Sequence, residues 1–396
     1  MFIGRGLAGA EPEGAAGGLT PSTSDSSARL FFYGANAPAS RFNFFPMPSI
    51  APKLRLNVLD QSPIRPGSTP REALLETVEL ARLADRLGYT RFWVSEHHNT
   101  STLAGSAPEV LIAHLGSHTS RIRLGSGGVM LPHYSALKVA ENFRLLEALF
   151  PGRIDLGMGR APGGDRLTAH ALNPSNTFSE QDFVEQLMDL QAYLRDEKVP
   201  DTIHERVMAA PQAATIPELW LLSSSGQSGL FAAHLGMAFS FAQFINGNGG
   251  PAAVRQYRER FRPSRELAAP LANVAVFLVC ADTEAKAQAL RAALDLMLLR
   301  FGKGERGSFP TAEEAAAYRF SSEDQAHLTF NRNRVVSGTP GQVHAQLTQL
   351  AADYAVDEIT AVTITASFED RVRSYELLAE AFALAPVAAE HEQMLA

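Results

Sequence analysis

Eight short apolar runs, each followed by a segment with apolar side chains at helical spacing, succeed one another along this chain and constrain its fold more than any other feature. The first run covers residues 54–60, and in residues 71–87 apolar side chains recur every three or four positions until Gly88. Such alternation predicts a parallel α/β sheet, and eight units close a (β/α)₈ TIM barrel. The other predicted strands cover residues 92–96, 122–131, 154–159, 219–223, 238–244, 274–280 and 359–365.

The segments between these strands predict helices over residues 107–119, 136–150, 179–195, 228–235, 252–261, 284–300 and 370–384. One interval departs from the pattern, because a polar stretch at 302–337 and a helix opened by Thr339 and Pro340 precede the last strand. We expect residues 302–337 to be an insertion that acts as a lid over the barrel mouth, with Arg332 and Arg334 in reach of a phosphate or substrate.

A doubly wound open sheet is the alternative fold, since it also alternates strands and helices. Its nucleotide-binding forms carry the pattern G-x-G-x-x-G where a strand opens into a helix. The nearest match here, residues 157–163, continues as a loop through Pro162 and further glycines. The barrel is therefore the favoured fold.

The first part of the chain differs from the rest. Residues 1–52 are rich in Gly, Ala, Ser and Pro without a lasting period, so we expect a disordered extension before a barrel domain at residues 53–396. This extension lacks the basic start and apolar run of a secretory signal. Met47 is an alternative start of the protein.

Charge and cysteine content exclude several classes of partner. The net charge is −7 and no block of basic residues occurs, which argues against a nucleic-acid partner. No stretch approaches 18 apolar residues, so we expect no membrane span. The one cysteine, Cys280, lies in an apolar run and reads as a packed core thiol, which suits a cytoplasmic protein.

Two neighbouring strand ends carry groups suited to a phosphate. Ligands of such barrels bind at the carboxyl ends of the strands. Residues 223–228 place serines and a glycine where a helix begins, and Arg160 follows the preceding strand. Amides at a helix start, hydroxyls and a guanidinium together bind a phosphate. The simpler alternative is a serine cap and an arginine paired with an acid.

The run Glu96-His97-His98 ends the second strand and allows two readings. A metal site is one, as in metal-dependent barrel hydrolases. Successive side chains of a strand point to opposite faces, however, so His97 and His98 do not readily bind one ion. We favour an acid–base or hydrogen-bonding role for His97 and leave His98 open between that role and a structural one.

A glycine pair, Gly127-Gly128, interrupts the third strand. Glycine weakens a strand interior, so two in succession indicate that something flat or bulky approaches the backbone closely. A β-bulge without a ligand is the alternative.

An ordered set of motifs in this chain resembles the bacterial-luciferase-like family of flavin-dependent monooxygenases, closest in style to its non-luminescent members. The similarity spans roughly residues 54–385. The motifs that carry it are FWVSEHH at 92–98, RLGSGGVMLP at 123–132, GRIDLGMGRAPG at 152–163, PELWLLSSSG at 217–226 and SGTPG at 337–341.

The resemblance implies a bound reduced FMN or, in some branches, a deazaflavin coenzyme. It implies that Arg160, Ser224, Ser225 and Ser228 surround the phosphate, although luciferase has a carboxylate at the position of Ser224. It further implies that Gly127-Gly128 is the site of a non-proline cis peptide against the flavin ring. His97 matches the active-site histidine of the family, and His98 matches the second histidine of that pair.

The resemblance also implies a function: an oxidoreductase or monooxygenase that uses reduced FMN and dioxygen on a small organic substrate. The reduced flavin would come from a separate flavin reductase or from a nicotinamide. A homodimer is expected, through the helices after the second and third strands. A non-catalytic flavin-binding protein and a metal-dependent barrel hydrolase remain as alternatives.

Overall fold

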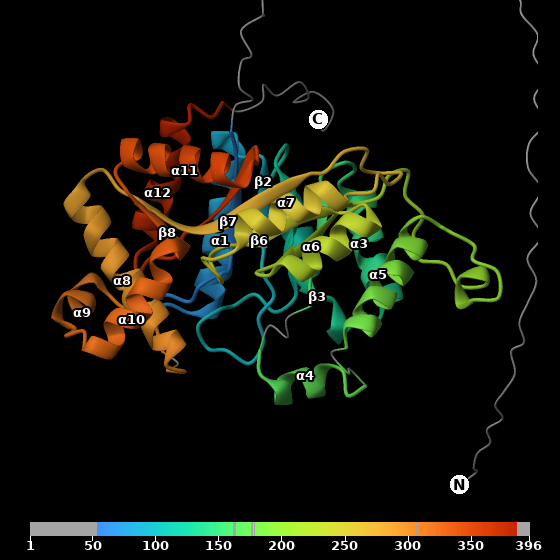
Figure 1. Ribbon diagram of the computed structural model, residues 1–396, viewed down its shortest axis with the longest axis horizontal. Coiled ribbons are helices and arrows are strands. Elements are labelled where there is room, and N and C mark those ends of the chain that lie inside the picture. The colour runs from blue at the N-terminus through green and yellow to red at the C-terminus, as the bar shows by residue number, and fades with distance from the viewer. Residues whose placement is uncertain (1–53, 161–163, 176, 178, 306, 386–396) are drawn as a thin grey trace, which may run out of the picture. The chain divides into compact units, whose positions relative to one another are not determined.

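Among the residues that the structure describes, eight parallel strands close into a ring. Figure 1 shows strands at the centre of the domain with helices around them. This computed structural model describes residues 54–160, 164–175, 177, 179–305 and 307–385, so the expectations for residues 1–52 lie outside it. The predicted TIM barrel is confirmed. The ring runs through β1 (Arg55–Asp60), β2 (Arg91–Val94), β3 (Arg123–Met130), β4 (Ile154–Gly159), β5 (Glu218–Ser223), β6 (Ala238–Ala242), β7 (Ala272–Cys280) and β9 (Glu358–Val362), which pairs with β1.

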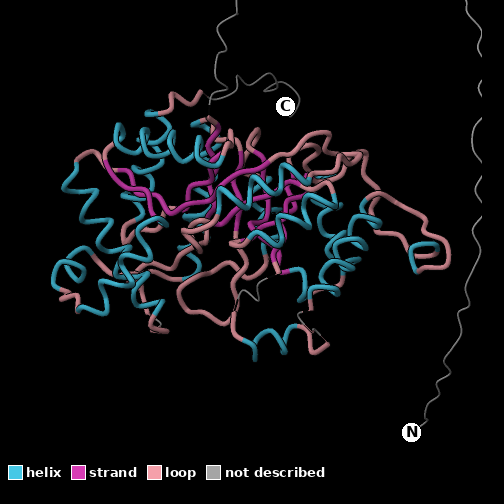
Figure 2. Tube along the Cα trace, viewed as in Figure 1, coloured by secondary structure: helices cyan, strands magenta, loops and turns pink. Residues whose placement is uncertain are grey.

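Helices surround this ring, with the strands gathered at the centre (Figure 2). They agree with the predicted segments, and α4 adds one in the interval after β4 that the sequence pattern did not predict. Their bounds are α1 (Pro70–Leu87), α2 (Pro108–Gly116), α3 (Ala136–Leu149), α4 (Arg166–Leu172), α5 (Glu180–Leu194), α6 (Gly226–Leu235), α7 (Gly250–Arg260), α8 (Glu284–Gly302), α9 (Ala312–Ala317), α10 (Ser322–Asn331), α11 (Pro340–Tyr354) and α12 (Phe368–Ala381), with 3₁₀ turns η1 (Leu131–His133), η2 (Ile203–Glu205) and η3 (Arg332–Arg334).

The insertion before the last ring strand has more regular structure than expected. Residues 302–337 were expected to be a polar insertion, and they contain α9, α10, η3 and most of a ninth strand, β8 (Val335–Gly338). This strand pairs with β7 at Phe277–Cys280, beyond the part of β7 that pairs with β9 at Val274–Phe277. Two valines are too short a signal for a strand, because periodicity needs more residues to show.

The ends of α1 illustrate why these segments fold locally as they do. Thr69 caps the helix in a reciprocal capping box with Glu72, and Pro70 occupies its first turn. Gly88 follows the helix with φ 86°, a left-handed conformation that favours glycine. Sequence and local geometry therefore agree on where α1 begins and ends.

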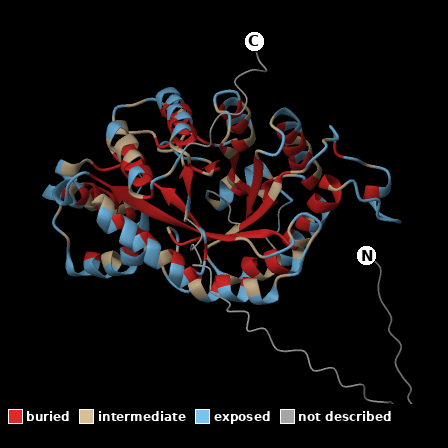
Figure 3. Ribbon diagram, turned by 90° about the horizontal axis from the view of Figure 1, so that it is seen from above, coloured by how far each residue is buried: buried red, intermediate tan, exposed pale blue. Residues whose placement is uncertain are grey.

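Apolar side chains pack on both sides of the ring, and the strands are buried while the helices expose their outer faces (Figure 3). Inside the ring, the rings of Trp93 and Trp220 meet nearly edge to face, with centroids 5.2 Å apart. None of the helices formed by the described residues is both long and apolar enough to cross a membrane.

Charged side chains fill the end of the barrel where the strands begin. Arg91, 3% exposed, lies 2.8 Å from carboxylate oxygens of Asp155 and Glu218 and 3.0 Å from Glu358. Its guanidinium also lies 4.8 Å from the centre of the Trp220 ring. We call these charged side chains the Arg91 network. Four strands supply its members, so charged side chains occupy this end of the barrel, whereas ligands of such barrels bind at the carboxyl ends of the strands.

Candidate active site

The loops after β1 and β2 pack against each other at the carboxyl end of the barrel. The Ile64 amide donates to Thr102 O over 2.8 Å, and the Ala104 amide donates to Ser62 O over 2.9 Å. The His97 amide donates to Gly105 O, also over 2.9 Å. Hydrogen bonds between the two loops, and within the loop after β2, therefore hold the backbone around His97 in place.

The His97 ring is held by its neighbour Ser95. Ser95 Oγ lies 3.0 Å from His97 Nδ1, and Ser95 is 4% exposed. Burial, together with a smaller effect of the nearby His98, lowers the pKa of His97 to about 4. The ring is therefore neutral at neutral pH, with one nitrogen able to donate a hydrogen bond and the other to accept one.

The two histidines point to different partners, as expected for neighbours on an extended segment. His98 Nε2 lies 2.7 Å from Glu96 Oε1, and Glu96 is fully buried. Tyr134 also donates to Oε1, over 2.8 Å, and the Met130 amide donates to Oε2 over 2.9 Å. Glu96 thus links His98 to Met130 and Tyr134, at the end of β3 and the turn after it. His97 bonds instead to Ser95.

The glycine pair of β3 lies where close backbone contact requires it. A Cβ atom on Gly128 would lie 2.8 Å from Gly157 O, and one on Gly127 would lie 2.6 Å from a methyl carbon of Leu59. The bond between Gly127 and Gly128 is a cis peptide, and the pairing with β4 shifts by one residue there. The resemblance to the luciferase-like family implied a cis peptide at this position, and the alternative interpretation of the glycine pair was a β-bulge. The structure has both.

Arg160 and the start of α6 meet at one carboxylate, that of Glu180. Arg160 Nη1 lies 2.9 Å from Glu180 Oε1, and the Gln227 side-chain amide donates to Glu180 Oε2. Glu180 is the first residue of α5, and Gln227 lies in the first turn of α6. The structure therefore brings together the end of β4 and the serine segment after β5.

The serines of that segment leave the start of α6 without a side-chain cap. Ser225 occupies the N-cap position, but its hydroxyl lies 3.2 Å from Ser223 Oγ instead of bonding to an amide of the first turn. Ser224 is held by its carbonyl, which accepts from Asn246 Nδ2 over 3.0 Å, and Ser228 is buried. The first-turn amides of α6 thus have no side-chain acceptor at the N-cap, and free amides at a helix start bind anions.

Glu180 provides a test of whether this region fits a phosphate. Its two oxygens are bonded by a guanidinium from one side and an amide from the other. A phosphate monoester offers several oxygens of the same kind and a higher charge. The residues present therefore fit an anionic group of that type. We call Arg160, Ser224, Ser225, Ser228 and the first turn of α6 the phosphate cradle.

Sequence reasoning missed Glu180, Gln227 and Asn246. An acid directly after Ser179 reads as an ordinary stabilising charge in the first turn of a helix, so nothing in the sequence singled out Glu180.

Arg334, expected near a phosphate or substrate, donates to Phe244 O over 2.8 Å and to Asn331 Oδ1 over 2.6 Å. Its guanidinium thus fastens η3 to the loop after β6.

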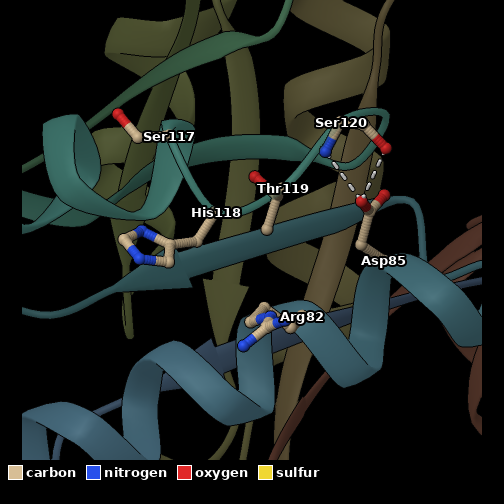
Figure 4. A pocket seen from close by; sticks show the side chains of 6 residues that line it. All are labelled: Arg82, Asp85, Ser117, His118, Thr119 and Ser120. Carbon is tan, nitrogen blue, oxygen red and sulfur yellow. Dashed lines mark hydrogen bonds between the residues drawn. The ribbon is translucent and has the colours of Figure 1, made fainter. Parts of the chain in front are cut away.

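Two other features of the described residues bear on the choice of site. These residues contain no group of three or more His, Cys, Asp or Glu side chains arranged to hold a metal. A concave region lies at the opposite end of the barrel (Figure 4), and there Asp85 accepts from the Ser120 amide over 2.8 Å and from its hydroxyl over 3.1 Å. Asp85 fastens the start of β3 to α1, which is a structural role.

Comparison with known proteins gives a family and several relatives. The sequence profile of the family described as luciferase-like monooxygenase matches residues 54–358. The uncharacterized protein YwcH of Bacillus subtilis is 52% identical over 83% of this chain and 99% of its own length. The N-acetyl-S-alkylcysteine monooxygenase of the same organism is 39% identical over 83% of this chain and 98% of its own length. The crystal structure of apo-MsnO8 is 41% identical, covers 84% of this chain and all of its own, and superposes with a TM-score of 0.79.

More remote solved structures share the fold. One is the oxygenating component of 3,6-diketocamphane monooxygenase of Pseudomonas putida in complex with FMN, at 19% identity, a TM-score of 0.60, and 83% and 97% coverage of the two chains. Another is an F420-dependent secondary alcohol dehydrogenase, at 12% identity, a TM-score of 0.61, and 83% and 99% coverage. At these identities the likeness concerns the barrel alone.

Proposed function

Because this chain belongs to the luciferase-like monooxygenase family, we propose that it binds reduced FMN at the carboxyl end of the barrel and uses dioxygen to oxygenate a small organic substrate. The observation that carries the proposal is the meeting of Arg160 and the first turn of α6 at one anionic group. The alternatives are a protein that binds flavin without catalysis and, less favoured, a metal-dependent hydrolase.

In this proposal the phosphate cradle binds the flavin phosphate. Arg160 supplies the positive charge, and the serines with the first-turn amides of α6 supply hydrogen-bond donors. Gly127 and Gly128, which lack side chains, let the flavin ring approach β3 closely. Reduced flavin supplies the chemistry with dioxygen, while the protein binds and orients it and excludes water.

His97 is the proposed catalytic residue. Its low pKa keeps the ring neutral, and its Nδ1 is engaged by Ser95. Nε2 is then the nitrogen that donates or accepts a hydrogen bond at the reacting end of the site. We propose that His97 holds or moves a proton there, with Glu96 and His98 as a supporting pair behind it.

FMN is favoured over a deazaflavin coenzyme for two reasons. The N-acetyl-S-alkylcysteine monooxygenase that is 39% identical to this chain is named for an oxygenation. The F420-dependent neighbour, at 12% identity, is named as a dehydrogenase. A monooxygenase needs a reduced flavin that reacts with dioxygen, and a separate flavin reductase or a nicotinamide would supply the electrons.

The substrate class and the setting are further parts of the proposal. N-acetyl-S-alkylcysteines are the first compounds to test, because a relative that aligns along 98% of its length is named for them.

We place the enzyme in the cytoplasm, which suits a buried free thiol at Cys280. We also propose a homodimer through α2 and α3, whose outer faces expose Val110, Leu145 and Leu149.

A flavin titration tests the function. Purified protein is titrated with FMN while absorbance and flavin fluorescence are recorded, and reduced FMN is titrated anaerobically in the same way. Arg160→Ala should weaken FMN binding by roughly tenfold or more, whereas Arg166→Ala, an equal charge change at an exposed position of α4, should not. Equal affinities of the two variants, or no binding by the wild type, would refute the proposed site.

Catalysis is tested separately from binding. Reduced FMN is supplied anaerobically, N-acetyl-S-alkylcysteine is added with oxygenated buffer, and an oxygenated product is sought by mass spectrometry with ¹⁸O₂. Label in the product from the wild type and none from His97→Asn, at equal flavin binding, would support a monooxygenase. Flavin binding without product from any tested substrate class would favour the non-catalytic alternative.

A further inference from the structure

The carboxylate of Glu180 lies among the groups that the proposed function assigns to the flavin phosphate. One oxygen is 2.9 Å from Arg160 Nη1, and the other accepts from the Gln227 side chain at the start of α6. Arg160 is the cationic side chain of the phosphate cradle. Its guanidinium therefore already has an anionic partner supplied by the chain itself.

Two anions in this cradle repel each other. A guanidinium between a carboxylate and a phosphate dianion is surrounded by an excess of negative charge. The carboxylate also occupies an N–H donor of Arg160 that a phosphate oxygen would otherwise use. The first turn of α6 has no side-chain cap, so its backbone amides can donate hydrogen bonds to a phosphate. Glu180 accepts instead from the side chain of Gln227. The exchange of one anion for the other is thus favoured when phosphate is present.

The present bonds of Glu180 are of a kind that breaks easily. The Glu180 side chain is 51% exposed and that of Arg160 is 32% exposed. Exposed ion pairs contribute little to stability because water competes for both partners. Displacing the carboxylate therefore costs little, and its rotation towards solvent needs no movement of α5.

We infer that Glu180 is an internal competitor for the flavin phosphate. The inference rests on the proposed function and adds to it a residue that sets affinity. Flavin enters the cradle as the Glu180 carboxylate leaves Arg160, so the protein binds phosphate-bearing flavin more weakly than its donors alone would allow. Riboflavin, which has no phosphate, does not meet this competition.

The size of the effect follows from the strength of the ion pair that is broken. An exposed ion pair accounts for up to about fivefold in an equilibrium constant, and this pair must break before the phosphate binds. Removal of the charge in Glu180→Gln should therefore tighten FMN binding up to about fivefold. The shape of the side chain is kept, so steric effects are small.

The test compares FMN, riboflavin and inorganic phosphate as ligands of the full chain. Affinities for FMN and riboflavin are measured by fluorescence titration, and inorganic phosphate is measured by its competition with FMN. Glu185→Gln is the matched control, because Glu185 is exposed on the same helix and bonds to Gln181 rather than to the cradle. We expect Glu180→Gln to bind FMN and phosphate more tightly than the wild type and the control, with riboflavin unchanged.

The outcomes separate the inference from the proposed function. Unchanged or weaker FMN binding by Glu180→Gln, or an equal gain in Glu185→Gln, would overturn the inference while leaving the flavin site in place. An equal gain for riboflavin would also overturn it, because the effect would not act through the phosphate. Failure of the wild type and both variants to bind FMN would refute the proposed function, and the inference with it.

Discussion

Ser95 and His97, two residues apart on the loop that follows β2, are joined side chain to side chain at 3.0 Å between Oγ and Nδ1. The contact fixes the orientation of the imidazole, since the His97 backbone amide is also bonded, to Gly105 O over 2.9 Å. A ring held at one nitrogen presents the other in a defined direction. His97 is thus oriented by the fold before any ligand binds.

The buried His97 should make stability depend on pH. Burial lowers the pKa of His97 to about 4, against about 6.5 in an unfolded chain. Between these values the unfolded chain binds a proton that the folded protein does not, so the stability contribution is complete above the unfolded pKa and is lost as pH falls to the folded one. From pH 6.5 to pH 4, the wild type should lose up to about 3 kcal/mol more than His97→Asn in its free energy of unfolding. Urea unfolding at a series of pH values measures this, and parallel curves would contradict it.

The Arg91 network should be sensitive to loss of its centre. Replacing Arg91 by Met removes the buried cation that Asp155 and Glu358 share and leaves each with a more exposed arginine, Arg123 and Arg55 respectively, so it should cost about 3 kcal/mol. Arg55→Met removes a partner of the same Glu358, but Arg55 is 46% exposed and the expected cost is below about 1 kcal/mol. Denaturant midpoints of the two variants check the difference. Similar costs would mean that burial does not decide the strength of these pairs.

Gly157 should not tolerate a side chain. A Cβ atom there would lie 2.1 Å from Ser126 O and 2.8 Å from a methyl carbon of Leu222. Because a backbone atom of β3 cannot move without disturbing the sheet, Gly157→Ala should lower stability by at least about 2 kcal/mol. Gly341→Ala, at a position in α11 with no atom within 4 Å of the added carbon, is the control and should not lower the melting temperature, because helices favour Ala over Gly. Thermal unfolding gives both values.

The proposed homodimer is tested by charge on α3. Leu145 and Leu149 are 52% and 57% exposed on one helix, so a glutamate at Leu145 would lie buried and unpaired in an interface there. Sedimentation should find the wild type as a dimer and Leu145→Glu as a monomer at micromolar concentration. Phe301→Glu, on α8 at a site 76% exposed, should leave the wild-type mass unchanged. A monomeric wild type would refute the dimer.

The barrel could be predicted because its signal is repeated. Strand β4 begins and ends where expected. Helix α1 begins one residue earlier than expected and ends where expected, because Gly88 marks its end in the sequence as well as in the structure. Strand β8 escaped prediction because its pairing with β7 is a tertiary contact made by two valines and two small residues. Single-sequence periodicity does not record such pairings.

The candidate site was predictable only in part. Arg160 and the serines stood out because strand ends carry ligands in barrels, and the structure does bring Arg160 to the start of α6. Glu180 and Glu96 did not stand out in their roles, because a carboxylate looks the same in sequence whether it faces water, a guanidinium or a histidine. The Arg91 network was missed for the same reason, since a charge at the start of a strand normally lies at the surface.

The Arg91 network lies at the end of the barrel where the strands begin. In barrels of this kind ligands bind at the other end, between the loops that follow the strands. Substitutions in those loops can then change which molecules bind without disturbing the Arg91 network. Selection for new substrates and selection for a stable fold act, in this architecture, on separate sets of residues.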